Sequence, residues 1–197
     1  ADIHVIDNGQ RVPLDGAALQ SLVESACDGL GADVKAEPIL AETRRNLYDG
    51  VPIDEVYKAS ILAARTLIEK DPAYSRATAR LLLHTIRREI LGGEVTQAQM
   101  GERYAEYFPN YIKNGVQAEL LDDKLLQFDL ARLGAALLPE RDLQFDYLGL
   151  QTLYDRYFLV DQYVGGRRFE LPQCFFMRVA MGLALNEIDR EARAVQF

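Results

Sequence analysis

The segment from Arg141 to Leu185 constrains the fold of this chain more than any other part of the sequence. In its first half, large apolar and aromatic residues recur at the spacing of one helix face: Tyr147, Leu150, Tyr154 and Tyr157. A repeat of three to four residues is typical of a helix with one buried face. We therefore expect these side chains, with Phe158, to lie in a core rather than to form a stacking platform for nucleic-acid bases.

The second half of this segment predicts a β-hairpin followed by a buried helix. The sequences YFLV and RRFEL flank Gly165-Gly166, as two strands flank a turn. Pro172 then stands where a first-turn proline loses no helical hydrogen bond. From Pro172 to Leu185 only Gln173 and Arg178 interrupt the apolar run, which predicts burial on nearly all sides. Such a helix needs a large partner, so we expect the chain to be the front part of a larger protein.

Composition argues against several classes of protein. The chain has 197 residues, 49% hydrophobic and 26% charged, which is ordinary for one large or two small globular domains. Its net charge of −8 disfavours sequence-independent binding to nucleic acid and docking on anionic membranes. No run approaches the roughly 20 apolar residues that span a bilayer. Two cysteines without metal-ligand spacing are typical of a reduced, cytoplasmic protein with no metal site.

Residues 1–93 predict a hairpin followed by four helices. Asn8-Gly9 lies between Ile3–Ile6 and Val12–Leu14, and Asn-Gly is a strong signal for a hairpin turn. The four helices are expected as follows: one capped by Asp15 and ended by Gly29, one over Ile39–Tyr48, one with Pro52 in its first turn and ended by Asp71-Pro72, and one ended by Gly92-Gly93. We expect this part to form a compact domain.

From residue 94 onward the pattern changes to shorter helical pieces. They are expected over Gln97–Phe108, Asn110–Val116, Asp122–Gln127 and Leu130–Leu138, with Pro109, Gly115 and Pro139 as breaks. Glu94–Thr96 is the predicted boundary, which divides the sequence into residues 1–93 and 94–197. The predicted fold class is mainly α (α+β), with a small N-terminal β-hairpin capped by four helices and a helical region that contains one further hairpin.

Residues that could support catalysis are scarce. His4 and His84 form no metal-ligand pattern, and we expect His84 on a helix surface or packed against a neighbour. Cys27 and Cys174 lie in helical, apolar surroundings, so we interpret both as small buried side chains rather than redox groups. The glycines are scattered as turns and stops, and no glycine-rich phosphate loop is present.

Charged pairs are weaker candidates. Asp122-Asp123 and Glu140 with Asp142 could serve acid–base chemistry, but without a pocket or partner we expect them at the surface or as helix caps. Arg167-Arg168 beside the predicted hairpin could bind an anion, and a plain solvated turn is the competing interpretation. The residues by themselves indicate a helical, intracellular, non-catalytic region.

Two long segments carry a resemblance to a known family. RDLQFDYLGLQTLYDRYFL, followed by FELPQCFFMRVAMGLAL, resembles the helical region that precedes the catalytic barrel in the large subunit of class I aerobic ribonucleotide reductases. NLYDGVPIDEVYKASILAARTLIEKDPAYSRATARLLLHTIRREILG resembles the latter half of that family's ATP-cone, a small hairpin capped by helices. The resemblance implies an ATP-cone-like domain over residues 1–93 and the helical start of the subunit over 94–197.

The resemblance also implies an enzyme as the parent protein, a ribonucleoside-diphosphate reductase that makes deoxyribonucleotides for DNA synthesis. The implied partners are a small radical-generating subunit, further large subunits, and thioredoxin or glutaredoxin as reductant. No nucleic-acid or membrane partner is expected. Neither Cys27 nor Cys174 falls in a motif that matches the family's catalytic cysteines. We therefore assign no catalytic residue and expect the chain alone to be inactive.

The family's allosteric site is where this sequence departs from the pattern. A working ATP-cone has a Lys-Arg-x-Gly turn and a later Lys-Ile pair, because cations bind the triphosphate. The corresponding residues here are Ile6, Asp7, Asn8 and Gly9 in the turn, Ala18 and Leu19 in the first helix, and Ile53 and Tyr57 in the third. Gly9 and the cap Asp15 remain, but all three cations are absent. This implies a retained cone fold that binds neither of the effectors ATP and dATP, and no other cofactor is expected.

Three hypotheses follow. In the first, the chain is a regulatory and structural N-terminal region of the large subunit, with a nucleotide-competent cone upstream and this one acting as spacer and oligomer contact. In the second, the parent is the same but this cone binds ATP or dATP through other residues. In the third, the chain is a nucleotide-sensing transcriptional regulator, which predicts CxxC pairs and a basic patch that the sequence lacks.

The large partner that the segment from Arg141 to Leu185 requires is expected to be the catalytic barrel. The apolar face within Tyr147–Leu185 should then be exposed in the isolated chain. Exposed apolar faces of this kind promote association between copies. We therefore expect the isolated chain to self-associate.

Overall fold

The N-terminal hairpin turns at Asn8 and Gly9. In the computed structural model, which describes residues 2–161 and 166–197, these two residues join β1 (His4–Asp7) to β2 (Gln10–Pro13). Their φ angles are 50° and 76°, a left-handed region that asparagine and glycine enter more readily than other residues. The antiparallel register pairs Val5 with Val12, which confirms the hairpin predicted from Asn-Gly.

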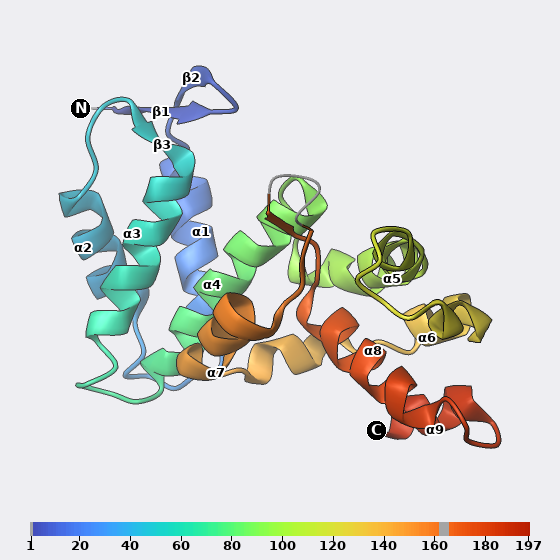
Figure 1. Ribbon diagram of the computed structural model, residues 1–197. Coiled ribbons are helices and arrows are strands. Elements are labelled where there is room, and N and C mark those ends of the chain that lie inside the picture. The colour runs from blue at the N-terminus through green and yellow to red at the C-terminus, as the bar shows by residue number, and fades with distance from the viewer. Residues whose placement is uncertain (1, 162–165) are drawn as a thin grey trace. The chain divides into compact units, whose positions relative to one another are not determined.

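A third strand, which the sequence did not predict, completes the N-terminal sheet. β3 (Val51–Pro52) pairs parallel to β1, so the strand order is β2-β1-β3. Val5 and Val51 lie opposite each other in this pairing, and both are buried. Figure 1 shows this sheet at one end of the helices that follow β2 and β3.

Four helices follow in the predicted order: α1 (Gly16–Cys27), α2 (Ala36–Arg45), α3 (Ile53–Thr66) and α4 (Tyr74–Leu91). The Asp15 carboxylate caps α1 by accepting a 3.0 Å hydrogen bond from the amide of Ala18. α2 packs against both α1 and α3. Their shared core is apolar: Leu19, Val23, Ile39, Val56, Ala64, Ala77 and Leu81. The predicted series of a hairpin and four helices is confirmed.

The chain folds as two compact units that do not follow chain order. The first contains residues 1–85 and 143–152, and the second contains residues 86–142 and 153–197. The predicted division of the sequence at Glu94–Thr96, into a cone-like and a helical domain, stays a prediction.

Helix α7 (Tyr147–Thr152) belongs to the first unit. Its first amide is bonded to α4: Tyr147 N donates a 3.0 Å hydrogen bond to Ser75 Oγ. The Arg65 guanidinium lies over the Tyr147 ring, 5.7 Å from its centroid. Arg80 donates to the backbone oxygens of Asp28 and Leu143, so it links the end of α1 to this later segment.

The second unit is built on one long helix. Its α-helices are α5 (Met100–Gln117), α6 (Leu130–Ala135), α8 (Pro172–Ala184) and α9 (Arg190–Gln196), with 3-10 turns at Gln97–Gln99, Asp123–Gln127 and Pro139–Gln144. The last of these turns crosses into the first unit at its end. The largest fully buried side chains of the second unit are Ile86, Met100, Tyr104, Phe108, Tyr111, Ile112, Leu133 and Leu171.

Helix α5 corrects the prediction of two helices separated at Pro109. Pro109 lies inside α5, although its missing amide loses the hydrogen bond to the carbonyl of Ala105 and its ring crowds that carbonyl. Gly134 of α6 packs beside that carbonyl: a Cβ added to Gly134 would lie 3.3 Å from Ala105 O. The close packing of α6 at this point supports the helix through the proline. Gly115 is likewise an interior residue of α5, not a stop.

The tyrosine stripe is confirmed only in part. Leu150 is buried, and Tyr147 and Tyr154 are half-buried, but Tyr157 is 58% exposed. The segment Leu153–Tyr157 is a π-helix, which has more residues per turn than an α-helix. Tyr157, at the end of this π-helix, therefore does not lie on the face that an α-helical repeat predicts.

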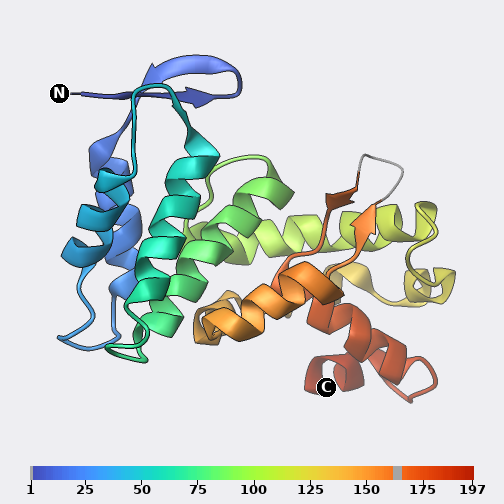
Figure 2. The same ribbon diagram turned by 60° about the vertical axis from the view of Figure 1, so that its left-hand side comes forward.

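The later hairpin is confirmed by its two strands. β4 (Val160–Asp161) pairs antiparallel with β5 (Arg167–Arg168), with Asp161 opposite Arg167. Gly166 has a φ of 74°, as a tight turn requires. The other predicted turn residue, Gly165, lies outside the described residues. Figure 2 shows the two strands beside α5.

Helix α8 begins at Pro172 as predicted, but it is not buried on all sides. Its inner face contains Gln173, Cys174, Met177, Ala180, Met181 and Ala184. Phe176, Val179 and Leu183 repeat at helical spacing on the outer face and are 44%, 43% and 66% exposed. The prediction of an exposed apolar face in the isolated chain is thus confirmed. Burial all round would need a partner that the described residues do not supply.

Candidate functional site

The predicted allosteric positions lie around the N-terminal sheet. Ile6 is in β1, opposite Pro52 in the parallel pairing with β3, so it lies one residue along from Ile53 at the start of α3. Asp7 ends β1, and Gly9 lies in the exposed turn that follows. The strand pairing therefore brings Ile6 and Ile53 together.

The other two predicted positions lie on the helices. Ala18 is in the first turn of α1, where its amide is already bonded to Asp15. Tyr57 is in α3, and its ring packs edge-on against His84 of α4, with ring centroids 4.7 Å apart. This contact confirms that His84 is packed against a neighbour. The residues around the sheet therefore present aliphatic and aromatic side chains where a triphosphate needs cations.

The cation nearest in sequence to the turn is engaged elsewhere. Arg11 of β2 forms an ion pair with Asp49, and the same carboxylate accepts a 2.7 Å hydrogen bond from the amide of His4. The His4 ring also lies 3.3 Å from Asp49. The His4 amide, assisted by the Arg11 charge, lowers the pKa of Asp49 below its ordinary value. Asp49 therefore fastens β1 and β2 to the loop before β3, and it neutralises Arg11.

The first turn of α3 adds negative charge near this sheet. Asp54 and Glu55 occupy the first turn, where acidic residues stabilise a helix N-terminus. Lys58 is paired with Glu55 at 3.3 Å. A helix N-terminus can bind a phosphate, but here the carboxylates occupy that electrostatic role. Around this sheet, the cations Arg11 and Lys58 are therefore each paired with a carboxylate.

Both cysteines are buried, as predicted. Burial raises the pKa of Cys27 to about 11. Burial also raises the pKa of Cys174 well above its ordinary value, with Glu170 and Asp142 adding to the effect. Because the thiolate is the reactive form, neither cysteine has the environment of a redox group.

Asp142 corrects the prediction of a surface carboxylate. It is 1% exposed and accepts hydrogen bonds from Tyr104 at 2.7 Å, from Gln173 at 2.8 Å and from Arg87 at 3.1 Å. Burial raises its pKa, and the Arg87 charge opposes that shift. Its neighbour Glu140 is exposed as predicted. Asp122, of the other acidic pair, caps a 3-10 turn as expected, with a 2.9 Å hydrogen bond from Lys124 N.

A second buried carboxylate was missed from the sequence. Glu170 is fully buried and pairs with Arg178 of α8, accepts from the hydroxyl of Tyr111, and accepts a 2.6 Å hydrogen bond from the amide of Leu159. In the sequence, Glu170 stands between Phe169 and Leu171 just before a helix, a position where an exposed carboxylate at the end of a strand is equally expected. Its burial depends on Tyr111, 59 positions away, as well as on Arg178 in the helix that follows.

The Arg167-Arg168 pair binds groups of the protein itself. Arg167 Nη2 donates to the backbone oxygen of Glu89 at 3.3 Å. Arg168 Nε donates to the backbone oxygen of Tyr154 at 2.9 Å, and its guanidinium lies 4.0 Å from the Tyr154 ring centroid. The sequence suggested either an anion site or a solvated turn, whereas both arginines contact groups of the protein itself.

Metal and membrane sites were also sought in the part of the chain that the structure describes. There, no group of three or more His, Cys, Asp and Glu side chains is arranged to bind a metal ion. Across the same residues, no helix is both long and apolar enough to span a membrane.

Comparison with known proteins places this chain among reductase subunits. The family model for the ribonucleotide reductase all-alpha domain matches residues 143–197. The chain is 38% identical over 190 residues to the ribonucleoside-diphosphate reductase subunit alpha of Chlamydia muridarum, covering 96% of this chain and 18% of the relative. The Helicobacter pylori subunit alpha is 34% identical, with 96% and 23% covered. The Danio rerio large subunit is 28% identical, with 94% and 23% covered.

The similarity extends over nearly the whole chain, in both compact units. The chain nevertheless spans only about a fifth of the length of the relatives it matches, in their N-terminal region. These matches do not favour a transcriptional regulator. The chain belongs to the family of ribonucleoside-diphosphate reductase large subunits, the alpha subunits of an oxidoreductase.

Proposed function

We propose that this chain is a regulatory and structural N-terminal region of a large subunit that reduces ribonucleoside diphosphates to deoxyribonucleotides. The names of the relatives support the parent activity. The two cysteines of this chain are buried with raised pKa values, which supports a region that takes no part in thiol chemistry. The proposed role is to connect the cone-like unit, residues 1–93, to the rest of the enzyme.

The cone-like unit is proposed to retain its fold without binding ATP or dATP. One observation carries this proposal: Arg11 is the cation of the hairpin, and it is paired with Asp49. The predicted phosphate-binding positions are occupied by Ile6, Asp7 and Ala18. A triphosphate at this sheet would meet the negative charge of the Asp7 carboxylate, and like charges at contact distance cost about 1 kcal/mol or more even in water.

The outer face of α8 is proposed to be the connection to the remainder of the subunit. Phe176, Val179 and Leu183 form an exposed apolar stripe, which is the usual mark of a packing surface. The proposed partners are the small radical-generating subunit, further large subunits, and thioredoxin or glutaredoxin. The proposed location is the cytoplasm, where buried, unpaired thiols such as Cys27 remain reduced.

Calorimetric titration tests the loss of nucleotide binding. The full 197-residue chain is titrated with ATP and with dATP in the presence of magnesium. We expect no saturable heat at nucleotide concentrations up to about 1 mM, which corresponds to a binding free energy weaker than about −4 kcal/mol. Micromolar binding of either nucleotide would exclude the loss of nucleotide binding and favour the hypothesis that this cone binds ATP or dATP through other residues. Folding is checked independently by circular dichroism.

A further inference from the structure

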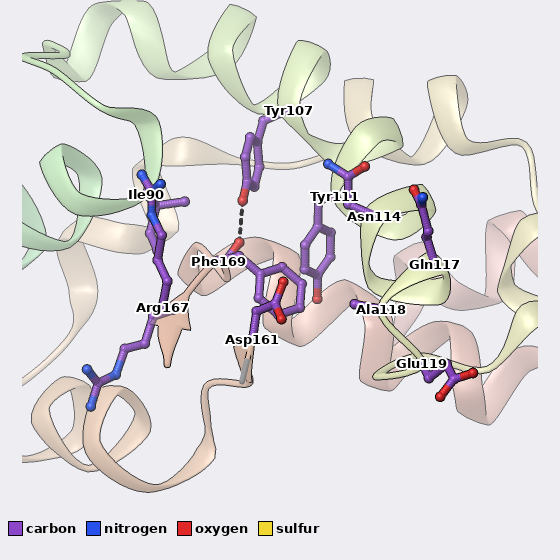
Figure 3. A pocket seen from close by; sticks show the side chains of 11 residues that line it. Ile90, Tyr107, Tyr111, Asn114, Gln117, Ala118, Glu119, Asp161, Arg167 and Phe169 are labelled. Atoms are coloured by element: carbon purple, nitrogen blue, oxygen red, sulfur yellow. Dashed lines mark hydrogen bonds between the residues drawn. The ribbon is translucent and has the colours of Figure 1, made fainter. Parts of the chain in front are cut away.

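A pocket opens in the second unit between the C-terminal half of α5 and the β4–β5 hairpin. Its volume is about 720 Å³, within the range of small-molecule sites. Figure 3 shows Tyr107, Tyr111 and Phe169 at its centre, with Asn114 and Gln117 along the α5 side. None of these residues belongs to the predicted allosteric site, which lies in the other unit.

The aromatic walls of this pocket are fixed by contacts among themselves. The Tyr107 and Tyr111 rings stack, with centroids 6.0 Å apart and planes at 20°. The Tyr111 and Phe169 rings lie 5.6 Å apart at 45°. The Tyr107 hydroxyl donates to the backbone oxygen of Phe169, which joins the hairpin strand to the helix. The walls are therefore preformed, and Tyr107 and Phe169 remain partly accessible to a ligand.

The α5 end of the pocket is polar and carries negative charge. α5 ends at Gln117, so its C-terminal carbonyls, with their partial negative charge, lie at this end. Glu119 lines the pocket just beyond, is exposed, and forms no ion pair among the described residues. The amides of Asn114 and Gln117 are likewise without a side-chain hydrogen bond in the described chain. Asp161 adds a second carboxylate from the hairpin.

The two arginines of the pocket have their own partners. Arg167 donates to the last turn of α4 at Glu89 O, and it lies opposite Asp161 in the hairpin pairing. Arg168 is stacked on Tyr154. Both guanidinium groups are therefore directed to groups of the protein, at Glu89 and Tyr154, and Figure 3 shows Arg167 on the opposite side of the pocket from Glu119. At the α5 end of the pocket, Glu119 is therefore the charged side chain without an ion pair among the described residues, which favours a cation there.

We infer that this pocket binds a small organic cation with a flat body, such as an aryl amidinium, guanidinium or ammonium compound. Its flat body lies against Phe169, which packs beside Gly115 near the end of α5, and its charged group faces Glu119. Aromatic faces attract cations through their quadrupole, and the carboxylate adds a charge-assisted hydrogen bond. This inference is independent of the proposed function, because no residue that lines the pocket is among the predicted nucleotide-binding positions.

The test compares three probes of one shape and different charge: benzamidine, benzamide and benzoate. Each is titrated into the full chain, labelled with ¹⁵N, and the backbone amide shifts are followed. We expect saturable shifts at Asn114, Gln117 and Glu119 with benzamidine, binding at least about threefold weaker with benzamide, and none with benzoate. Equal or tighter binding of benzoate, or saturable shifts confined to other residues, would overturn the inference, as would no saturation up to about 20 mM benzamidine.

Two variants locate the binding. Glu119→Gln removes the charge from an exposed side chain and should weaken benzamidine about tenfold at low salt. Glu106→Gln, also exposed on α5 but outside the pocket, is the matched control and should leave the affinity unchanged. Equal affinity of the parent chain and the Glu119→Gln variant would contradict the assigned site. Tyr107→Leu should also weaken binding, and since it loses the bond to Phe169, its amide spectrum is checked for folding first.

Discussion

The Tyr104 hydroxyl donates a 2.7 Å hydrogen bond to the carboxylate of Asp142, and both side chains are buried although they lie 38 positions apart. Gln173 and Arg87 complete the set of donors to the same carboxylate. Four segments of the second unit, from α4, α5, α8 and the 3-10 turn before α7, thus meet at one charged group. A buried charge fully supplied with partners specifies one arrangement of these segments.

Removal of the Asp142 carboxylate should strongly destabilise the second unit. Asp142→Ala leaves the Arg87 charge, whose side chain is 7% exposed, without its partner. Breaking a buried pair in this way costs about 3–5 kcal/mol. Urea denaturation measures the change in unfolding free energy. Glu140→Ala, an exposed acid two residues away, should change it by less than about 0.5 kcal/mol. Equal effects of the two variants would contradict the buried network.

Asp49 should make the stability of the first unit depend on pH. Its pKa is lowered by the His4 amide and the Arg11 charge, so the folded state favours the carboxylate. The stability it contributes is therefore present above the ordinary aspartate pKa and is lost as pH falls through the lowered value. Asp49→Asn should lower the melting temperature at pH 7, and the difference from the parent should shrink below about pH 4.

The control for this pH series is Asp2→Asn. Asp2 is exposed and forms no ion pair within the described residues, so its removal should leave the whole pH profile nearly unchanged. Melting temperatures are measured by calorimetry from pH 7 downward. A difference between the Asp49→Asn variant and the parent that grows as the solution is acidified would contradict the sign of this linkage.

Neither thiol should react in the folded chain. Burial raises the pKa of Cys27 to about 11 and that of Cys174 well above its ordinary value, so the thiolate is scarce near neutral pH. We expect no release of colour from Ellman's reagent at pH 8 without denaturant, and two equivalents in guanidinium chloride. Rapid modification of the native chain at either cysteine would refute the buried placement.

The outer face of α8 should make the isolated chain self-associate. Phe176, Val179 and Leu183 expose an apolar stripe to water. Leu183→Glu interrupts it with a charge and should shift the weight-average mass towards that of the monomer in light scattering. Leu148→Glu is the control, because Leu148 is 75% exposed on α7, in the other unit. A strictly monomeric parent chain at all concentrations would count against association through this face.

Local signals in the sequence predict much of the fold. Asn8-Gly9 gives the hairpin, Asp15 the start of α1 and Pro172 the start of α8, because each acts through its own backbone geometry. The two-residue β3 escapes detection, since its pairing with β1 depends on residues 45 positions or more away. Pro109 misleads because the tertiary contact of α6 with α5 outweighs its local preference.

The candidate sites are less predictable than the fold. Burial of Asp142 and Glu170 depends on donors from distant helices, Arg87 and Tyr111 respectively, and no local pattern in the sequence records those pairings. The position of Tyr157 changes because a π-helix shifts the repeat by part of a turn. The absence of cations at the predicted phosphate-binding positions, in contrast, is read directly from the sequence at Ile6, Asp7 and Ala18.

Residue-resolved titration with dATP tests most directly whether the proposed cone-like unit has lost nucleotide binding. ¹⁵N amide spectra of the full chain are recorded with dATP and magnesium up to about 1 mM, a concentration that detects binding free energies near −4 kcal/mol. We predict no saturable shift at the amides of Ile6, Asp7, Ala18, Ile53 and Tyr57. Saturable shifts clustered at these five positions would contradict the loss of nucleotide binding.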